Sequence, residues 1–364
     1  MTSPPHPDSL RSDGDNSADL RAELAEQFRR QAEWCKRLGS DLYARLLTEA
    51  AADAGRGGLV WRALSAHLPA PQMEVMLPLR FMAAVHTLVL RGDAPALEPF
   101  YPSVGGGAVR GDEWPAFAAT LGDHLAEVRK LSGAPVQTNE VGRCAALIGG
   151  FLRVAAETRM PLRLLEVGCS AGLNLRWDRY RYESPRGSWG PAGSPVRLIW
   201  DDPPAHLEAP IVIAGRSGCD LVPLDPAQQS DRIRLLSAVW PDQLDRIERL
   251  RAALSAAASL PIELETGSVS DVAPRWLGRP TRGVATVIFH SVVLQYLTDE
   301  QRTTFLQVLE AAGERATSEA PLAHLTLEPS DEVLPFAVCL RTWPGGDEVV
   351  LASSGPHGSD IAWK

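Results

Sequence analysis

The segment from Leu162 to Asn174 constrains the fold of this chain more than any other stretch. Apolar residues 162–167 run into a turn of small residues, and Glu166 stands just before its first glycine. Because Gly168 and Gly172 have no Cβ atom, such a turn lets the backbone approach a ligand closely. The pattern therefore predicts a buried strand, a ligand-binding turn and a helix, in that order.

The charge of this turn separates two classes of ligand. A dinucleotide fingerprint requires G-x-G-x-x-G, but Ser170 and Leu173 stand where its second and third glycines would be. Glu166 would also repel a pyrophosphate bound at the N-terminus of the following helix. The same carboxylate would attract a cation. S-adenosylmethionine suits the turn because it carries an ammonium and a sulfonium but no phosphate.

A resemblance narrows this interpretation. The stretch 166–180 is similar to motif I of the class I S-adenosylmethionine-dependent methyltransferases, except that Ser170 stands at the middle glycine. Together with Gln137–Glu140 and Val239–Gln243, it more closely resembles an uncharacterised bacterial family, domain of unknown function 2332. The resemblance covers nearly all of the chain beyond the N-terminal tail. It implies a Rossmann-like class I methyltransferase fold: an α/β, mainly parallel sheet with a C-terminal antiparallel hairpin, preceded by an α-helical region.

The same turn also matches the nucleophile elbow, G-x-S-x-G. Ser170, Asp271 and His290 follow the chain order of an α/β-hydrolase triad, and Gly105–Gly107 could serve as an oxyanion loop. A hydrolase elbow, however, follows several earlier strands of its sheet, whereas the residues before Leu162 show helical periodicity. We therefore favour the methyltransferase over the hydrolase.

Size and composition bound the remaining possibilities. A chain of 364 residues predicts two domains or one domain with a large cap. The net charge of -9 argues against nucleic acid as a partner. No apolar run approaches a membrane span and no signal peptide is evident, so we expect a cytoplasmic protein without membrane contact. The cysteines and histidines lack ligand spacing, which indicates reduced thiols and no metal.

Periodicity divides the chain into three regions. Residues 1–19 are expected to form a disordered tail, 20–160 an α-helical cap over an acceptor pocket, and 161–364 a methyltransferase-like domain with an insertion around 178–230. In the last region we expect strands at 162–167, 210–221, 262–265, 284–290 and 324–328, an inserted hairpin of 177–182 with 196–200, a terminal hairpin of 336–343 with 348–353, and helices at 231–258, interrupted at Pro241, and 299–312.

Ligands of open α/β sheets bind at the carboxyl ends of the strands, which selects the candidate residues. For the cofactor these are Glu166, Gly168, Ser170, Gly172 and Asn174 in the first turn. The resemblance implies a ribose-binding carboxylate at the end of the second strand, for which Asp220 is preferred and Asp201 is the alternative. It also implies an acid near the adenine amine, and Asp271 is the candidate, although it could equally cap a helix.

The acceptor side has its own candidates. His290 is the candidate catalytic residue, because it follows the fourth strand and its side chain titrates near neutral pH; a purely structural histidine is the alternative. The resemblance suggests that Asn139 and Arg143 face the site. Trp177, Tyr180 and Tyr296 are expected to line the acceptor pocket, although aromatic residues at such spacing also build cores.

We therefore expect S-adenosylmethionine as the cofactor and direct transfer of its methyl group to a small-molecule acceptor. Holding donor and acceptor in line supplies about 7–11 kcal/mol, whereas a general base adds about 3–5 kcal/mol, so no obvious base is required. A non-catalytic ligand-binding protein on the same fold is the alternative, because of Ser170 and the uncertain ribose acid. A hydrolase using Ser170 is the third. The sequence specifies neither the acceptor nor the oligomeric state.

Overall fold

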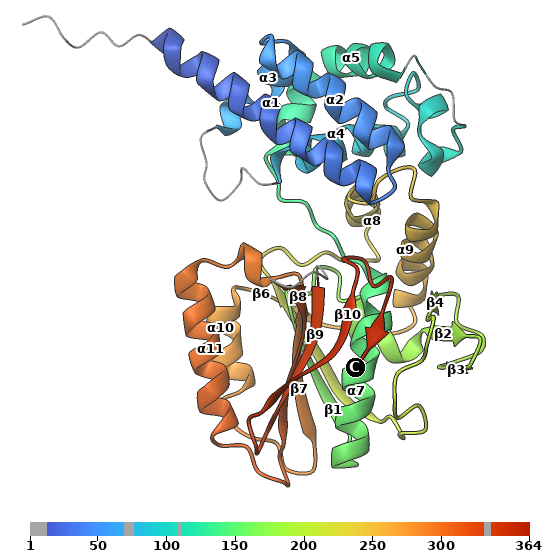
Figure 1. Cartoon of the computed structure of the whole chain (residues 1–364), viewed down its shortest axis with the longest axis vertical. Helices are drawn as coiled ribbons and strands as arrows, with labels where there is room; N and C mark the ends of the chain where they lie inside the picture. The colour runs from blue at the N-terminus through green and yellow to red at the C-terminus, as the bar shows by residue number, and fades with distance from the viewer. Residues whose placement is uncertain (1–12, 69–75, 108–110, 112, 331–335) are drawn as a thin grey trace, which may run out of the picture. The chain divides into compact units, whose positions relative to one another are not determined.

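The computed structural model describes residues 13–68, 76–107, 111, 113–330 and 336–364, which form two compact units (Figure 1). The first unit contains Met1–Gln137 and Ile233–Ile247, and the second contains Thr138–Arg232 and Glu248–Lys364. The two later boundaries fall within helices α8 (Gln229–Ser237) and α9 (Leu244–Ala257), the two halves of the expected helical stretch around Pro241. The first unit is thus assembled from two separate stretches of chain.

The first unit is helical throughout its described residues. Its elements are α1 (Asp13–Arg37), α2 (Asp41–Gly55), α3 (Leu59–Leu64), η1 (Ser65–His67), α4 (Leu77–Arg91), η2 (Glu98–Phe100), η3 (Pro102–Val104), α5 (Glu113–Asp123) and α6 (Leu125–Ser132). Aromatic residues of three helices meet in its core, where the Phe81 ring lies 5.7 Å from that of Phe28 and 5.8 Å from that of Phe117. Residues 1–12 of the expected tail lie outside the described residues, and 13–19 already belong to α1.

The stretch 239–243 completes this unit. Trp240 packs in its core, with its ring 6.3 Å from that of Tyr43. Asp242 accepts hydrogen bonds from Ser40 Oγ at 2.6 Å and from Leu42 N at 2.9 Å, so it supports the N-terminus of α2. The residues that resemble the bacterial family here therefore have a structural role.

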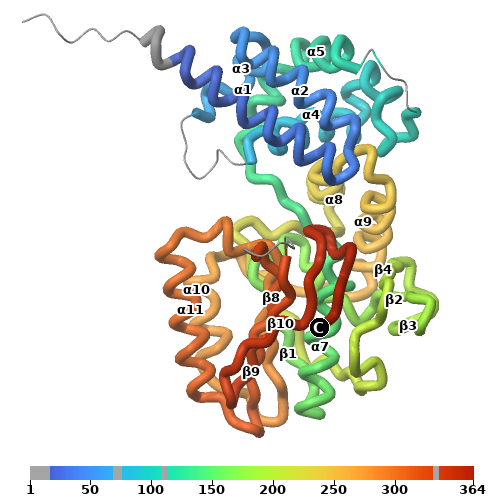
Figure 2. Tube along the Cα trace, in the orientation of Figure 1, coloured from blue at the N-terminus to red at the C-terminus, as the bar shows by residue number. Residues whose placement is uncertain are grey.

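The second unit is built on one mostly parallel sheet. Its strands are β1 (Leu162–Val167), β5 (Ile213–Asp220), β6 (Leu264–Thr266), β7 (Ala285–Ser291), β8 (Leu322–Pro329), β9 (Phe336–Trp343), β10 (Glu348–Ser354) and β11 (Ala362–Trp363). They lie in the order β11-β10-β9-β8-β7-β1-β5-β6, with β6, β5, β1, β7 and β8 parallel. The terminal strands are antiparallel, which confirms the predicted hairpin (Figure 2). The α/β class and the main strands are confirmed.

Helices cover both faces of this sheet. Phe289 of β7 packs edge-on against Phe151 of α7 (Cys144–Thr158), whereas the preceding residue, Ile288, packs with Phe305 of α11 (Asp299–Gly313). Since successive strand residues point to opposite faces, α7 covers one face and α11, with α10 (Val269–Trp276), covers the other (Figure 1). Because α7 packs on the strands, the second unit begins at Thr138 rather than near residue 160.

The insertion differs from the expected hairpin. The chain after β1 enters a 3-10 helix, η5 (Asn174–Arg179), which takes up the first residues of the expected strand 177–182. A separate sheet then forms in the order β3-β2-β4, from β2 (Arg181–Ser184), β3 (Gly187–Trp189) and β4 (Arg197–Ile199). The hairpin is formed by β2 and β3, which are joined by a turn at residues 185 and 186. The expected partner, β4, pairs parallel to β2 and so is not part of a hairpin.

None of the helices in the described part of the chain combines the length and the apolar character that crossing a membrane requires.

Gly218 of β5 tests how tightly the sheet packs on the turn after β1. A Cβ atom there would lie 2.7 Å from Cys169 Sγ, whereas a Cβ at Gly215 of the same strand would meet no atom within 4 Å. We predict that Gly218→Ala lowers the free energy of unfolding by about 1–3 kcal/mol, as overpacking does. Gly215→Ala, the matched control, should change it by less than about 0.5 kcal/mol in urea titrations. Equal effects of the two substitutions would contradict this packing.

Candidate functional site

The turn after β1 has a left-handed backbone at alternate residues. The φ angles are +65° at Gly168, +52° at Ser170 and +63° at Gly172. Glycine adopts this conformation at no steric cost, whereas Ser170 does so at a cost in strain. Gly168 is exposed, but the residues from Cys169 to Trp177 are buried. The backbone of the turn is therefore accessible at Gly168.

Three side chains from other elements hold the turn in place. Asn139 Oδ1 accepts hydrogen bonds from Ala171 N at 3.2 Å and Leu173 N at 3.0 Å. Asp220 Oδ2, at the end of β5, accepts one from Ser170 N at 2.9 Å. Arg176 Nη1 donates to Gly172 O at 2.7 Å. Asn139, which we expected to face the substrate, is buried and supports the turn instead.

Glu166 lies buried beneath the turn, with 2 % of its surface exposed. Burial raises the pKa of this carboxyl well above its usual value, although hydrogen bonds from the Asn174 side chain and the Leu175 backbone oppose the shift. Its Oε2 atom has no hydrogen-bond partner among the described residues. The Asn174 side chain therefore binds Glu166 and does not face the open edge of the sheet. A nearby cation would favour ionisation of Glu166.

Carboxylates recur along the same edge of the sheet. Each of β6, β5, β1 and β8 carries an acid in its last two residues, namely Glu265, Asp220, Glu166 and Glu328. The sequential order also reverses here, because β5 lies on one side of β1 and the later strand β7 on the other. Such a switch point is where open α/β sheets bind ligands. Glu265 already pairs with Arg275 and Glu328 with His290, so Glu166 and Asp220 are the acids that favour a cationic ligand at this edge.

Arg143 brings a positive charge to the same edge. From η4 (Val141–Arg143) its Nη1 donates to Ser291 O, at the end of β7, at 3.1 Å. Its Nε donates to Pro356 O at 3.0 Å. The arginine thus joins the C-terminal segment to the end of β7, and its expected role toward the substrate stays a prediction.

His290 does not open toward this edge. Its ring is fully buried beside Phe305, with Nδ1 2.6 Å from Glu328 Oε1 and Nε2 3.0 Å from His324 Nε2. Both ring nitrogens are therefore engaged inside the unit. The expectation of a catalytic side chain at the acceptor requires correction: the side chain of His290 points into the face covered by α11.

The hydrolase triad is not assembled. Ser170 Oγ has no hydrogen-bond partner within the described part of the chain, and Asp271 Oδ2 accepts a hydrogen bond from Ser268 Oγ, the N-cap of α10. The glycines 105–107 belong to the first unit, and among the described residues no strand precedes β1. Ser170 therefore lacks the histidine base that a nucleophile requires. Asp271 is exposed and lies in the first turn of α10, whose N-cap is Ser268 rather than Asp271 as our alternative had it.

The aromatic candidates separate into core and surface. Trp177 is fully buried and stacks on Phe151 with 4.6 Å between ring centroids, and the hydroxyl of buried Tyr180 donates to Leu173 O at 2.6 Å. Both side chains therefore belong to the core of the second unit. Tyr296, on η6 (Leu294–Tyr296) after β7, is 59 % exposed. Asp201 is exposed and follows β4, so it belongs to the small sheet rather than to the main edge.

Glu328 was missed by the sequence interpretation. It stands next to last in a buried strand, and an acid at this position was the available signal. Its Oε1 accepts hydrogen bonds from His290 and from Val293 N, the latter at 2.9 Å, while Oε2 is buried without a partner among the described atoms. No group of three metal-ligating side chains that could hold a metal ion is found within the described ranges.

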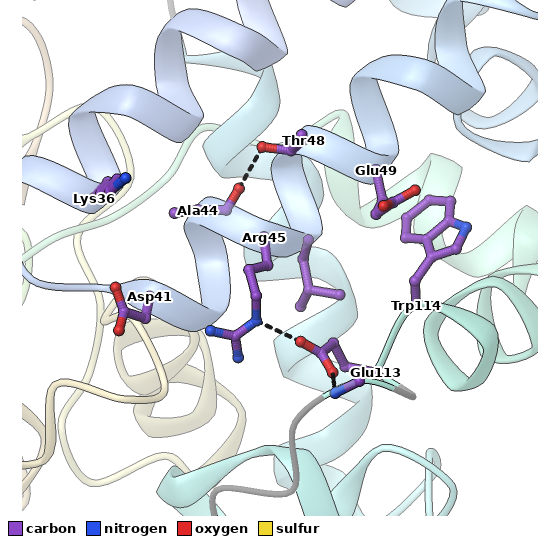
Figure 3. A pocket seen from close by; sticks show the side chains of 10 residues that line it. Lys36, Asp41, Ala44, Arg45, Thr48, Glu49, Glu113 and Trp114 are labelled. Carbon is purple, nitrogen blue, oxygen red and sulfur yellow. Dashed lines mark hydrogen bonds and ion pairs between the residues drawn. The ribbon is translucent and has the colours of Figure 1, made fainter.

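A separate hollow of about 690 Å³ lies in the first unit, beside α2 and Trp114 (Figure 3). Arg45 reaches from α2 to Glu113, whose Oε2 also accepts a hydrogen bond from Gly111 N at 2.7 Å. Burial raises the pKa of Glu113, but the hydrogen bonds from Arg45 and the backbone outweigh it and lower the pKa below its usual value. The charges at the base of the hollow therefore largely satisfy each other.

A family model described as "Uncharacterized protein conserved in bacteria (DUF2332)" matches residues 25–363, which include parts of both compact units. A search of curated proteins found no match.

His324 makes stability depend on pH. Burial, His290 and Arg341 lower its pKa well below 6.5, so the folded state binds this proton less readily than the unfolded state. We predict that stability is fully present above pH 6.5 and falls as the pH drops below it, by up to about 1.4 kcal/mol per pH unit. His324→Asn should flatten this slope in urea titrations between pH 5 and 8. The exposed control His206→Asn should leave it unchanged; a slope that both variants retain would argue against this origin.

Proposed function

The chain belongs to the DUF2332 family of bacterial proteins, as the resemblance of residues 166–180 indicated, and we propose that it is an S-adenosylmethionine-dependent methyltransferase acting on a small molecule. The proposal includes a Rossmann-like class I methyltransferase sheet. The parallel order β6-β5-β1-β7-β8 with antiparallel strands at one end supports it. The donor would bind at the carboxyl ends of β5, β1 and β7.

One observation carries the proposal: an exposed glycine lies at the switch point of a sheet edge lined with carboxylates. Gly168 presents backbone without a side chain, and Glu166 and Asp220 stand at the ends of the adjacent strands β1 and β5. Opposite charges attract and like charges repel, so this edge favours a sulfonium and an ammonium over a pyrophosphate. A dinucleotide fits the same edge poorly.

The residues divide the work of binding. Asp220 accepts hydrogen bonds from Ser170 N and Val222 N, and a carboxylate offers about four lone-pair sites, so ribose hydroxyls can be accepted as well. Glu166 lies below the exposed glycine, where binding of the cationic donor would favour its ionised form. Asn139 and Arg176 keep the turn rigid, so little ordering is required when a ligand binds.

When bound, S-adenosylmethionine would supply an activated methyl group. The chain's part would be to hold donor and acceptor in line, which is the larger contribution to such a transfer. The burial of His290 is compatible with this division, because a transfer governed by positioning needs no histidine base. The same burial makes a ligand-binding protein without turnover the second candidate function.

Titration calorimetry tests the donor directly. We predict saturable binding of S-adenosylmethionine and S-adenosylhomocysteine below millimolar concentration, with NAD as the control that does not bind, because the acidic edge repels its pyrophosphate. Labelled donor incubated with cell extract then separates transfer from binding alone. Absence of binding by both sulfur compounds would remove the proposal, and labelling of Ser170 by a fluorophosphonate would favour a hydrolase.

Glu166→Gln should weaken binding of the donor and stabilise the ligand-free fold. The folded-state pKa of Glu166 is raised above 4.5. The carboxyl therefore destabilises the ligand-free fold increasingly as the pH rises above 4.5. We predict that the variant is more stable than wild type at pH 8, equal to it near pH 4, and binds the cationic donor about 10-fold or more weakly. Urea titration and calorimetry measure both effects. The exposed control Glu263→Gln should alter neither; unchanged donor affinity in Glu166→Gln would contradict the role of the charge.

A further inference from the structure

The segment Ser291–Val293, called here the β7 turn, contains a backbone outlier. Val292 has φ +58°, in the left-handed region, and its β-branched side chain makes this conformation costly. Such strain persists only where surrounding contacts over-determine it, and it clusters at functional sites. The β7 turn lies at the switch point of the sheet, directly after the strand that neighbours β1.

Each residue of the β7 turn is held by a different partner. Ser291 O accepts from Arg143 Nη1 at 3.1 Å, Val292 N donates to Leu327 O at 2.9 Å, and Val293 N donates to Glu328 Oε1 at 2.9 Å. Of these three contacts, the one to Glu328 is made by a side-chain carboxylate. This contact fixes Val293, whose side chain reaches the turn after β1.

Val293 joins the two turns. A Cβ atom on Gly168 would lie 2.6 Å from Val293 Cγ2, so the valine side chain rests directly against the exposed glycine. A shift of the β7 turn would therefore change the surface that a ligand meets at Gly168. The strained turn sets the shape of the candidate site at this point.

The Glu328 carboxylate is itself held by residues buried inside the second unit. Glu328 Oε1 lies 2.6 Å from His290 Nδ1, and His290 Nε2 lies 3.0 Å from His324 Nε2, so a carboxylate and two imidazoles form one buried chain. One of the two facing nitrogens carries the proton that the other accepts. This chain limits the rotation of the Glu328 carboxylate and so fixes the oxygen that binds Val293 N.

We propose that Glu328 is a positioning residue of the site: oriented by His290 and His324, it holds the strained β7 turn in the conformation that presents Val293 to Gly168. The effect on donor binding rests on the proposed function, whereas the anchoring of the turn does not. His290 thereby acts through Glu328 rather than on a substrate.

Amide hydrogen exchange tests the anchor without any ligand. Glu328→Ala should speed exchange at Val293 N by at least about 10-fold, because a hydrogen bond to a carboxylate is lost from a strained turn. Glu328→Gln, which keeps an acceptor oxygen, should exchange more slowly than Glu328→Ala. The amide of residue 292, which donates to Leu327 O rather than to Glu328, should also lose protection in Glu328→Ala and regain it when Val292→Gly is added, since glycine adopts φ +58° without strain.

A matched control separates positioning from general stability. Arg159, exposed at the end of α7, also has a left-handed backbone, at φ +55°, so Arg159→Gly relieves comparable strain away from the β7 turn. Combined with Glu328→Ala, it should not restore protection of the amide of residue 292. Unchanged exchange in Glu328→Ala, or restoration that is equal or absent with both glycine substitutions, would overturn the anchoring role.

Calorimetry with S-adenosylmethionine then links the turn to the site. We expect binding about 10-fold weaker in Glu328→Ala and recovered in the double variant with Val292→Gly, a coupling that a double-mutant cycle measures. Wild-type protein that fails to bind the donor would remove the proposed function while the exchange results still decide the anchor. Equal donor affinity in wild type and Glu328→Ala would overturn the link between the turn and the site.

Discussion

The hydrogen bonds from Ala171 N and Leu173 N to the Asn139 side chain are the interaction on which the candidate site depends. A turn with alternating left-handed residues cannot satisfy its amides within a helix, and buried amides without acceptors are costly. One carboxamide, delivered from the segment before α7, meets this need. Asp220 does the same for Ser170 N. The conformation of the glycine turn therefore depends on the segments that carry Asn139 and Asp220 as well as on its own sequence.

Charge and burial act against each other at this edge of the sheet. Glu166 and Glu328 each have a buried carboxylate oxygen without a partner among the described residues, which a stable fold would ordinarily avoid. Val292 adds backbone strain at the neighbouring turn. Such costs are typical of sites whose polar groups serve a ligand or a defined geometry. Their concentration at the switch point distinguishes this edge from the rest of the sheet.

Much of the architecture could be predicted because local sequence patterns determine its strands and turns. The strands 162–167 and 284–290 are mostly apolar runs between turn signals, and Pro344–Asp347 predicted the turn of the terminal hairpin. The direction of His290 could not be read in the same way. The strand around it is buried on both faces, so its sequence shows no alternation to reveal which side the histidine occupies. Glu328 was missed for a related reason, since its partners come from elements distant in sequence.

The division of the first unit between two stretches of chain has a consequence for synthesis. Trp240 belongs to its core and Asp242 supports the start of α2, yet both are translated only after β1 and β5 of the other unit. The N-terminal helices therefore leave the ribosome without their last packing partner. They stay incomplete until residues up to 247 emerge from the exit tunnel, so the first unit cannot complete its core before β1 and β5 of the second have been synthesised.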